Sequence, residues 1–379
     1  MKLAFITLMG GVPYGGSEVL WTKTAKLALE NGHEVGIAIY DWGKQTHPLY
    51  NELKASGARI WLRPRFSHNL PPFKKMRNYI ENRIPSLKKH WQSLIRFKPD
   101  HVLINQGGCF DIIQHHYDLF HMLKDQGIPY SLLSHNHPQY SFLTEPHMLE
   151  SGKSVFLGAV NNFFISKTQQ KFVEKSLLVK LENASFTWNP LNLEKFELLE
   201  WPENENIQFA MVGALISGKG HDIAFESLSS QSWKNKDWKL NIYGKGDGEK
   251  YLKDYVDFLG IAEKVVFHGH VNNASEIWNK NHILLLPSSG EGLPISMMEA
   301  MVSGRPVVST DVGGIREIIK DGDNGFLSEG PTRVSFSNAM VRAYLNRSQW
   351  KQMGVKAHKE YFNEFAIPPE KKLLEKLVE

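Results

Sequence analysis

The sequence has very little cysteine. Its 379 residues include one, Cys109, which excludes a disulfide framework and a cysteine-based zinc site and fits a reducing, cytosolic location. No apolar run approaches the ~18 residues that a membrane-spanning helix needs, and no repeat or low-complexity segment occurs. The net charge of +4 is too small to indicate a nucleic-acid partner.

Strand-like and helix-like segments alternate along the chain. The opening MKLAFITLMGG is short for a signal peptide and has no small-residue cleavage site, so we predict a first strand. A helix over residues 17–31 follows, which we expect Ser17 to cap and Gly32 to end. The strand candidates are 2–9, 33–40, 101–106, 130–135, 161–166, 207–213, 240–246, 265–271, 282–289, 305–311 and 324–328. This alternation predicts parallel sheets joined by right-handed crossovers.

A loop-rich segment, 186–208, interrupts the alternation. It holds two prolines and several asparagines, which are typical of a domain boundary. We therefore predict domains at 1–190 and 191–360, with a hinge between them. We expect a charged amphipathic helix in 361–379 to pack on the first domain.

Residues 59–98 form a basic, aromatic-rich segment. It contains eleven lysines and arginines and one acid, Glu81. Such a segment could dock on an anionic membrane surface. It could equally grip a phosphorylated acceptor, or be a solvated face with an apolar underside.

The stretch EGLPISMMEAMVSGRP (291–306) places two acids, Glu291 and Glu299, eight residues apart. Pro294 favours a helix start directly after a strand and its loop, where ligands bind in open α/β sheets. A carboxylate among methionines is costly unless it has a partner. Sugar or ribose hydroxyls would supply one. Alternatively, Glu291 is a surface acid and Glu299 pairs with a nearby arginine such as Arg305.

The segment PSSGEGLPISMMEAMVSGRPVVSTDVGGIREIIKDGDNGFL (287–327) resembles the signature of glycosyltransferase family 4. Members of this family are retaining, nucleotide-sugar-dependent enzymes. The resemblance implies an α/β chain of the GT-B fold, with two Rossmann-like parallel-sheet domains facing a central cleft. It covers most of the chain but little of residues 50–100. Shorter segments that agree, in order, are GGSE (15–18), NGHEV (31–35), SHNHP (134–138), NPLNLEKF (189–196) and GKGDGEKYLKDYVDFLGIAEKVVFHGHV (244–271).

The resemblance implies roles for individual residues. Three are catalytic candidates: Glu291 would hold donor-sugar hydroxyls, Lys219 would neutralise the diphosphate, and His135 would lie near the reacting carbon. Glu299 would bind ribose hydroxyls, and the backbone of 267–271 would approach the base. The substrate-binding candidates are Gly15, Gly16, Gly213, Gly244, His268, Gly292, Leu293, Pro294 and Glu299.

One position departs from the family pattern. The arginine that usually follows the glycine of the GxL loop is Ala214 here, which removes a charge-assisted contact of roughly 1.5–3 kcal/mol. Another cation substitutes, or donor binding is weaker, or the protein is a degenerate member.

Transfer must stabilise negative charge on the departing diphosphate. Many transferases bind a metal there through an Asp-x-Asp pair. We identify no such pair in the sequence and therefore predict, in line with the family, transfer without a metal or other cofactor. No carboxylate is clearly placed as a nucleophile, so the resemblance implies front-side attack with retention.

Two nucleotide motifs are incomplete. GALISGKG (213–220) nearly matches a P-loop, but Gly220 replaces the hydroxyl residue that holds Mg²⁺; GKGDGE (244–249) is not G-x-G-x-x-G. The sequence therefore favours a glycosyltransferase that acts on a glycan or lipid-linked acceptor in cell-surface polysaccharide or glycoconjugate synthesis. The alternatives are a nucleotide-sugar epimerase or hydrolase on the same fold, or a non-catalytic homologue that binds nucleotide-sugars.

Overall fold

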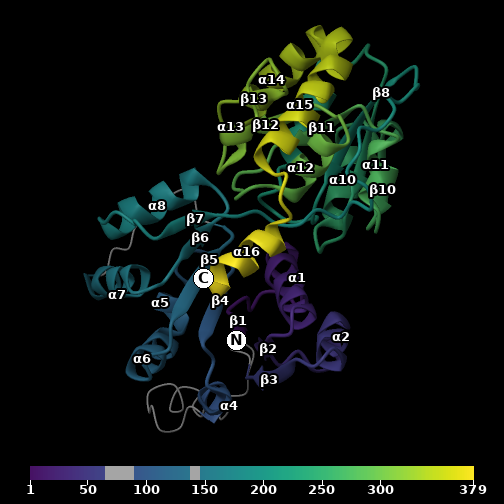
Figure 1. Cartoon of the computed structure of the whole chain (residues 1–379). Coiled ribbons are helices and arrows are strands. Elements are labelled where there is room, and N and C mark those ends of the chain that lie inside the picture. Colours follow the sequence, from purple (N-terminus) through teal and green to yellow (C-terminus); the bar gives the residue numbers. More distant parts are fainter. Residues whose placement is uncertain (65–88, 137–145) are drawn as a thin grey trace. The chain divides into compact units, whose positions relative to one another are not determined.

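The computed structural model describes residues 1–64, 89–136 and 146–379. It divides into two compact units (Figure 1), the first comprising Met1–Pro190 with Ile367–Glu379 and the second Leu191–Ala366. Most of the basic segment predicted to contact a membrane, residues 65–88, lies outside the described residues. Among the helices that are described, none is both long and apolar enough to span a bilayer.

The first unit is built on a seven-stranded parallel sheet with the order β3-β2-β1-β4-β5-β6-β7. The strands are β1 Lys2–Thr7, β2 Glu34–Tyr40, β3 Arg59–Arg63, β4 His101–Gln106, β5 Tyr130–Ser134, β6 Asn162–Phe164 and β7 Ala184–Phe186. The strand order reverses between β1 and β4, so their carboxyl ends form a topological switch point, where α/β sheets bind ligands. Sequence analysis missed the edge strands β3 and β7: β3 has an arginine at each end, and β7 is three residues long with no fully buried residue.

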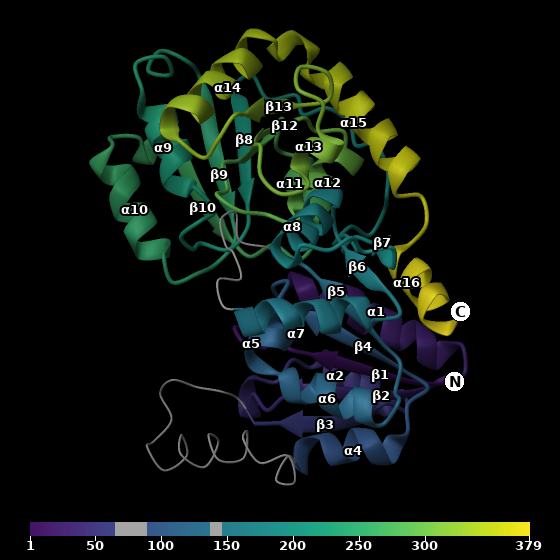
Figure 2. The ribbon, with the colours of Figure 1, turned by 90° about the vertical axis from the view of Figure 1, so that its left-hand side faces the viewer.

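Helices cover both faces of this sheet (Figure 2). They are α1 Gly16–Glu30, α2 Leu49–Ala55, α4 Lys89–Phe97, α5 Asp111–His115, α6 Tyr117–Asp125, α7 Pro146–Leu157, α8 Lys167–Leu177 and α16 Pro369–Val378. Leu3 and Phe5 of β1 pack with α1, α2 and α16 on one face, whereas Ala4 and Ile6 pack with α4–α8 on the other. This alternation is the two-residue period of a strand.

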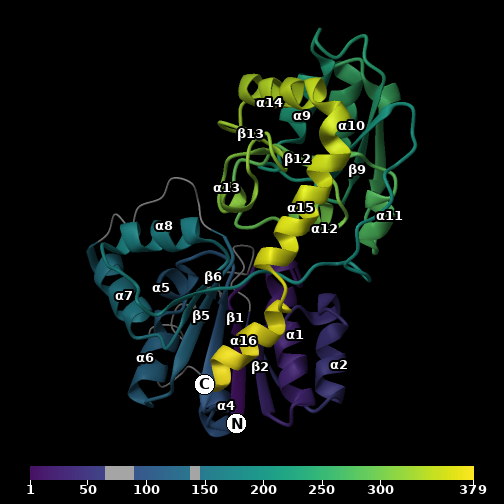
Figure 3. The ribbon, with the colours of Figure 1, turned by 45° about the horizontal axis from the view of Figure 1, so that its top comes forward.

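The terminal helix belongs to the first unit. Leu373, Leu374 and Leu377 of α16 share a buried core with Leu20 and Trp21 of α1, and the two helices lie side by side in Figure 3. The preceding helix is α15 (Trp350–Glu364). The sequence suggested a domain limit at residue 360, which lies inside this helix, whereas the second unit ends at Ala366.

The predicted cap of the first helix is wrong. Helix α1 begins at Gly16, with Gly15 at the N-cap position and no side-chain cap. Ser17 therefore lies inside the first turn, and its hydroxyl points to the sulfur of Met9, 3.6 Å away. The helix ends as predicted, because Gly32 adopts a left-handed φ of 78° that favours glycine.

The second unit contains a six-stranded parallel sheet with the order β10-β9-β8-β11-β12-β13. Its strands are β8 Ile207–Val212, β9 Trp238–Tyr243, β10 Val265–Gly269, β11 Ile283–Leu286, β12 Val307–Thr310 and β13 Phe326–Ser328. Its other helices are α9 His221–Ser229, α10 Glu249–Phe258, α11 Ala274–Trp278, α12 Ile295–Val302, α13 Ile315–Ile318 and α14 Arg333–Leu345. Here the strand order reverses between β8 and β11.

Candidate functional site

Two loops meet at the switch point of the second unit. Lys219 lies in the loop after β8, and Glu291 lies in the loop after β11. The Lys219 Nζ is 2.6 Å from Glu291 Oε1, with 30% and 10% of the two side chains exposed. Glu291 is therefore not a surface acid. The pair places a cation and a hydroxyl acceptor together where the fold binds ligands.

The Glu291 loop is held by the loop after β12. The Gly314 N–H donates to the Gly292 carbonyl at 2.7 Å, and the Thr310 hydroxyl donates to the Ser288 carbonyl at 2.5 Å. Gly313 has a φ of 58°, and a Cβ there would collide with the Glu291 carbonyl. This close approach explains why glycine is required at residue 313, a role that sequence reasoning missed.

Helix α12 starts where Pro294 predicted. Pro294 occupies the N-cap position, the helix begins at Ile295, and no side chain caps it. The first-turn N–H groups lack intrahelical acceptors, and the helix dipole makes this end favourable for anions. Leu293 is 7% exposed, so it anchors the loop in the core.

Glu299 lies in the second turn of α12 and is 4% exposed. One carboxylate oxygen accepts a hydrogen bond from the Asn192 backbone N–H at 2.9 Å. Burial raises the pKa of Glu299 to about 7, and the Asn192 hydrogen bond partly offsets this. The Glu299 side chain thus fastens the start of the second unit to α12. No sequence pattern predicted this contact.

The alternative pairing of Glu299 with Arg305 is wrong. The Arg305 guanidinium is buried and donates to main-chain carbonyls instead, among them those of Trp278 at 2.9 Å and Ser303 at 2.9 Å. It also donates to the Glu200 carbonyl at 2.5 Å. Arg305 therefore ties the segment around residue 200 to the rest of the second unit.

Gly213 and Gly244 end β8 and β9 and lie against each other. A Cβ on Gly244 would collide with the Gly213 carbonyl, and the Gly244 N–H donates to the Gly269 carbonyl at 2.7 Å. Beside them, the exposed Ala214 replaces the family arginine. Besides Lys219, this edge carries Lys245, whose carbonyl accepts from the Leu215 N–H at 3.1 Å. A Cβ on Gly269 would lie 3.7 Å from Lys245 Cε, so that side chain extends toward β10.

The His268 side chain is engaged within the second unit. Its Nε2 is 2.9 Å from Asn241 Oδ1, and its ring stacks on Tyr243 with centroids 4.6 Å apart. Partial burial and the charge of Lys280 lower its pKa. The residue next to it, Gly269, is the one bonded to Gly244.

In the first unit, His135 follows β5 and is 6% exposed. Its Nε2 is 2.7 Å from Asn105 Oδ1, at the end of β4. Burial lowers the pKa of His135 to about 3, so the ring is neutral at physiological pH. Gly15 and Gly16 begin α1 at the other strand of this switch point, and their backbone is half-buried and exposed, respectively.

Sequence reasoning quoted Glu18 within GGSE but assigned it no role. The structure places it 1% exposed beneath the switch point. Glu18 Oε1 accepts from the Thr7 hydroxyl at 2.7 Å, and Oε2 accepts from Trp21 Nε1 at 2.5 Å. Asn105 Nδ2 lies 3.4 Å from Glu18 Oε1. Burial raises the pKa of Glu18 to about 7, while these hydrogen bonds act in the opposite direction.

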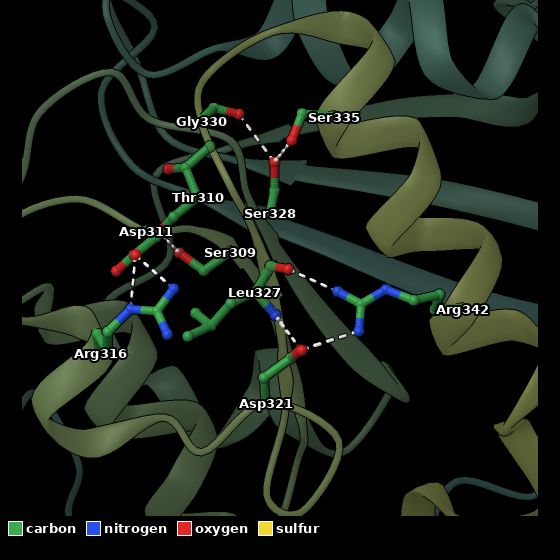
Figure 4. Close-up of polar contacts among 10 residues, drawn as sticks. All are labelled: Ser309, Thr310, Asp311, Arg316, Asp321, Leu327, Ser328, Gly330, Ser335 and Arg342. Carbon is green, nitrogen blue, oxygen red and sulfur yellow. Dashed lines mark hydrogen bonds and ion pairs between the residues drawn. The ribbon is translucent and has the colours of Figure 1, made fainter.

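The statement that the sequence contains no Asp-x-Asp pair is wrong, because Asp321-Gly322-Asp323 is one. Figure 4 shows Asp321 turned toward Arg342, with Oδ2 2.9 Å from Nη1, and it also accepts from the Leu327 N–H. Asp323 pairs with Lys356. Both acids thus serve ion pairs around β13. In the three described stretches, no group of three or more His, Cys, Asp and Glu could hold a metal ion.

A neighbouring ion pair supports the loop after β12. Arg316 Nε donates to Asp311 Oδ2 at 2.6 Å, and the Ser328 hydroxyl donates to the Gly330 carbonyl at 2.8 Å (Figure 4). These contacts brace the ends of β12 and β13, next to the loop that holds Glu291.

Comparison with known proteins places this geometry in context. The family model described as glycosyl transferases group 1 matches residues 194–360. An uncharacterized glycosyltransferase of Haemophilus influenzae is 28% identical over 257 residues, or 67% of this chain and 72% of that protein. The N-acetyl-alpha-D-glucosaminyl L-malate synthase of Bacillus anthracis is 30% identical over 129 residues, 34% of each chain. The crystal structure of Anabaena HepE in complex with UDP matches all of both chains, with a TM-score of 0.72 and 15% identity.

Proposed function

Since this chain carries a domain of the group 1 glycosyltransferases, we propose that it moves a sugar from a nucleoside-diphosphate donor to a glycan or lipid-linked acceptor. The resemblance predicted from residues 287–327 is confirmed by the family match, and so are the enzyme class and the GT-B fold. Assignment to family 4 within this group is part of the proposal. So is a role in cell-surface polysaccharide or glycoconjugate synthesis.

The Lys219–Glu291 pair is the observation that carries the proposal. A nucleotide-sugar presents an anionic diphosphate next to a polyhydroxylated ring, and the pair offers one partner for each. Lys219 would neutralise the diphosphate, and Glu291 would accept hydrogen bonds from sugar hydroxyls. The uncapped start of α12 adds N–H donors for the phosphates.

Glu299 supplies the third contact. Asn192 occupies one of its carboxylate oxygens at 2.9 Å, which leaves the other for vicinal ribose hydroxyls. UDP-glucose is the first donor to test, because the HepE structure has also been determined with UDP-glucose.

Transfer proceeds with retention and without a metal in this proposal. Lys219 and the helix start stabilise the charge that develops on the departing diphosphate. The acceptor hydroxyl attacks the anomeric carbon from the face that the diphosphate leaves, and a phosphate oxygen takes the hydroxyl proton. Full activity in excess EDTA and an unchanged anomeric configuration in the product, measured by NMR, are the expected results. Loss of activity that added divalent cations restore would overturn the metal-independent part.

The function is tested by a thermal-shift screen of nucleotide-sugars, followed by a transfer assay with the stabilising donor. Ligand binding to the folded state raises its melting temperature. We expect Glu291→Gln to reduce transfer by about 100-fold or more, because the charge is lost and one of the two acceptor oxygens becomes an NH₂ donor. The matched control is Glu329→Gln, an exposed acid of the same unit, which should retain full activity.

The alternatives give different outcomes in the same assays. An epimerase or hydrolase would consume the donor without any acceptor. A non-catalytic homologue would bind the donor but release no nucleotide, an outcome that the replacement at Ala214 makes worth testing. Normal transfer by Glu291→Gln would contradict the proposed site. A cytoplasmic location with peripheral membrane contact through residues 59–98 remains a prediction.

A further inference from the structure

A chain of hydrogen bonds connects four residues at the switch point of the first unit. His135 Nε2 is 2.7 Å from Asn105 Oδ1. Asn105 Nδ2 is 3.2 Å from the Thr7 hydroxyl oxygen and 3.4 Å from Glu18 Oε1. All four residues are buried, with exposed fractions between 1 and 6%. Each group in it therefore depends on the next one for its hydrogen bonds.

The donors and acceptors in this chain have only one consistent arrangement. The Thr7 hydroxyl donates its proton to Glu18 Oε1 at 2.7 Å, so the Thr7 oxygen offers Asn105 only lone pairs. At pH 8, above its raised pKa of about 7, the Glu18 carboxylate is ionised and likewise only accepts. The Asn105 atom that faces both must therefore be the NH₂ group, which leaves Oδ1 turned toward the imidazole.

The orientation of Asn105 in turn determines the histidine tautomer. Because Oδ1 is an acceptor, the nitrogen facing it must carry a proton, which makes Nε2 the donor. A neutral ring then has an unprotonated Nδ1. In the part of the chain that is described, Nδ1 is buried and has no hydrogen-bond partner, whereas an ordinary buried ring nitrogen has one.

We propose that Glu18 and Asn105 are positioning residues that hold His135 in its Nε2–H tautomer and present Nδ1 as an acceptor for a substrate hydroxyl. The hydroxyl part of this inference rests on the proposed function, whereas the tautomer does not. In this arrangement His135 is not a general acid, because Nδ1, the ring nitrogen without a protein partner, carries no proton. Its contribution is to orient a sugar hydroxyl.

The tautomer can be measured directly in the full-length wild-type chain. Long-range ¹H–¹⁵N correlation of histidine-labelled protein at pH 8 distinguishes a protonated from an unprotonated ring nitrogen, and the His135→Gln variant identifies the signals. We expect a protonated Nε2 and an unprotonated Nδ1. A protonated Nδ1 in the wild-type protein would overturn the proposal, whatever the variants do. His101, another buried histidine, bonds Ser131 at 2.9 Å and serves as an internal reference.

Variants then test which residues hold the tautomer. Glu18→Gln gives the position 18 side chain an NH₂ group, which frees the Asn105 amide to turn over, so a mixture of His135 tautomers is expected. The double variant Glu18→Gln/Asn105→Asp exchanges donor and acceptor. Gln at position 18 then donates to the new carboxylate, whose other oxygen accepts from Nε2, and the single tautomer should return. If the double variant shows the same mixture as Glu18→Gln, the relay is wrong.

Activity measurements separate this inference from the proposed function. Asn105→Ala should lower kcat about tenfold, the value of one hydrogen bond lost to a neutral hydroxyl, while the exposed control Asn51→Ala should not change it. His101 signals that match the wild-type spectrum show that each variant is folded. If the wild-type protein transfers no sugar yet shows the Nε2–H tautomer, the proposed function fails and the relay stands. If it transfers sugar and Asn105→Ala has wild-type kcat, the positioning role is overturned.

Discussion

Each unit has one almost completely buried glutamate near its switch point, and the surroundings of these two glutamates differ. Glu18 is 1% exposed and Glu299 is 4% exposed, and burial raises the pKa of each to about 7. Glu18 accepts from the side chains of Thr7, Trp21 and Asn105. Within the described residues, Glu299 accepts one hydrogen bond, from the Asn192 backbone.

This difference separates an internal role from a binding role. A buried carboxylate surrounded by donors has little capacity left for a ligand, so Glu18 orients its neighbours. A buried carboxylate with one donor is left under-satisfied, which costs free energy until a ligand supplies the missing hydrogen bonds. Lys219 also keeps capacity for a ligand. It pairs with Glu291, but 30% of its side chain is exposed, so the ammonium group remains accessible to an anion.

The largest effect should come from Lys219. Replacement by methionine removes the positive charge at the diphosphate and should lower kcat/KM for the donor by about a thousandfold. Glu18→Gln should lower it by no more than about tenfold, because Glu18 acts on the ligand only through the single hydrogen bond of His135. Steady-state kinetics with both variants measures these values of kcat/KM. A wild-type kcat/KM for Lys219→Met would show that Lys219 does not act on the diphosphate.

The pH dependence of stability should reveal both glutamates. A carboxyl whose pKa rises from 4.5 to about 7 on folding binds a proton more tightly in the folded state. Each carboxyl therefore stabilises the folded state by about 3 kcal/mol at pH values below 4.5. This stabilisation is lost as the pH rises through 7. Each glutamine variant should thus gain stability relative to wild type between pH 5 and pH 8, measured by urea unfolding. At pH 5, Glu18→Gln should be the less stable variant, because it disturbs three side-chain partners. A pH-independent difference would contradict the buried placement.

Nucleotide affinity should also distinguish Glu299 from Glu18. Glu299→Gln should weaken nucleoside-diphosphate affinity about tenfold, since a charged acceptor for ribose hydroxyls becomes neutral. Isothermal titration of the free nucleotide measures this without the sugar. Equal affinities for Glu299→Gln and Glu18→Gln would show that neither acid contacts the nucleotide.

The smallest effect should be that of Lys245. Its side chain extends toward β10, where Cε lies 3.7 Å from a Cβ placed on Gly269. We expect Lys245→Met to change donor affinity by no more than about threefold, as for a screened surface charge. A loss of tenfold or more would instead identify Lys245 as the cation that substitutes for the arginine missing at Ala214.

Much of the fold and part of the site follow from the sequence alone. Nearly continuous apolar runs such as LAFI in β1 and ILLL in β11 predict buried parallel strands, because both faces of such a sheet are covered. Pro294 predicted the start of α12, and the surrounding apolar residues indicated that Glu299 is buried. These features are local, and a few neighbouring residues determine them.

Tertiary structure decided which distant residues meet. Lys219 and Glu291 are 72 residues apart, Glu18 and Asn105 are 87 apart, and Asn192 and Glu299 are 107 apart. No local pattern specifies such pairs, because strand order and register bring them together only once each sheet has formed. For the same reason the sequence suggested Arg305 as a partner for Glu299, whereas the packed chain offers its guanidinium a set of main-chain carbonyls. The residue types and the elements that carry them are encoded locally; the contacts that define the site depend on which strands become neighbours.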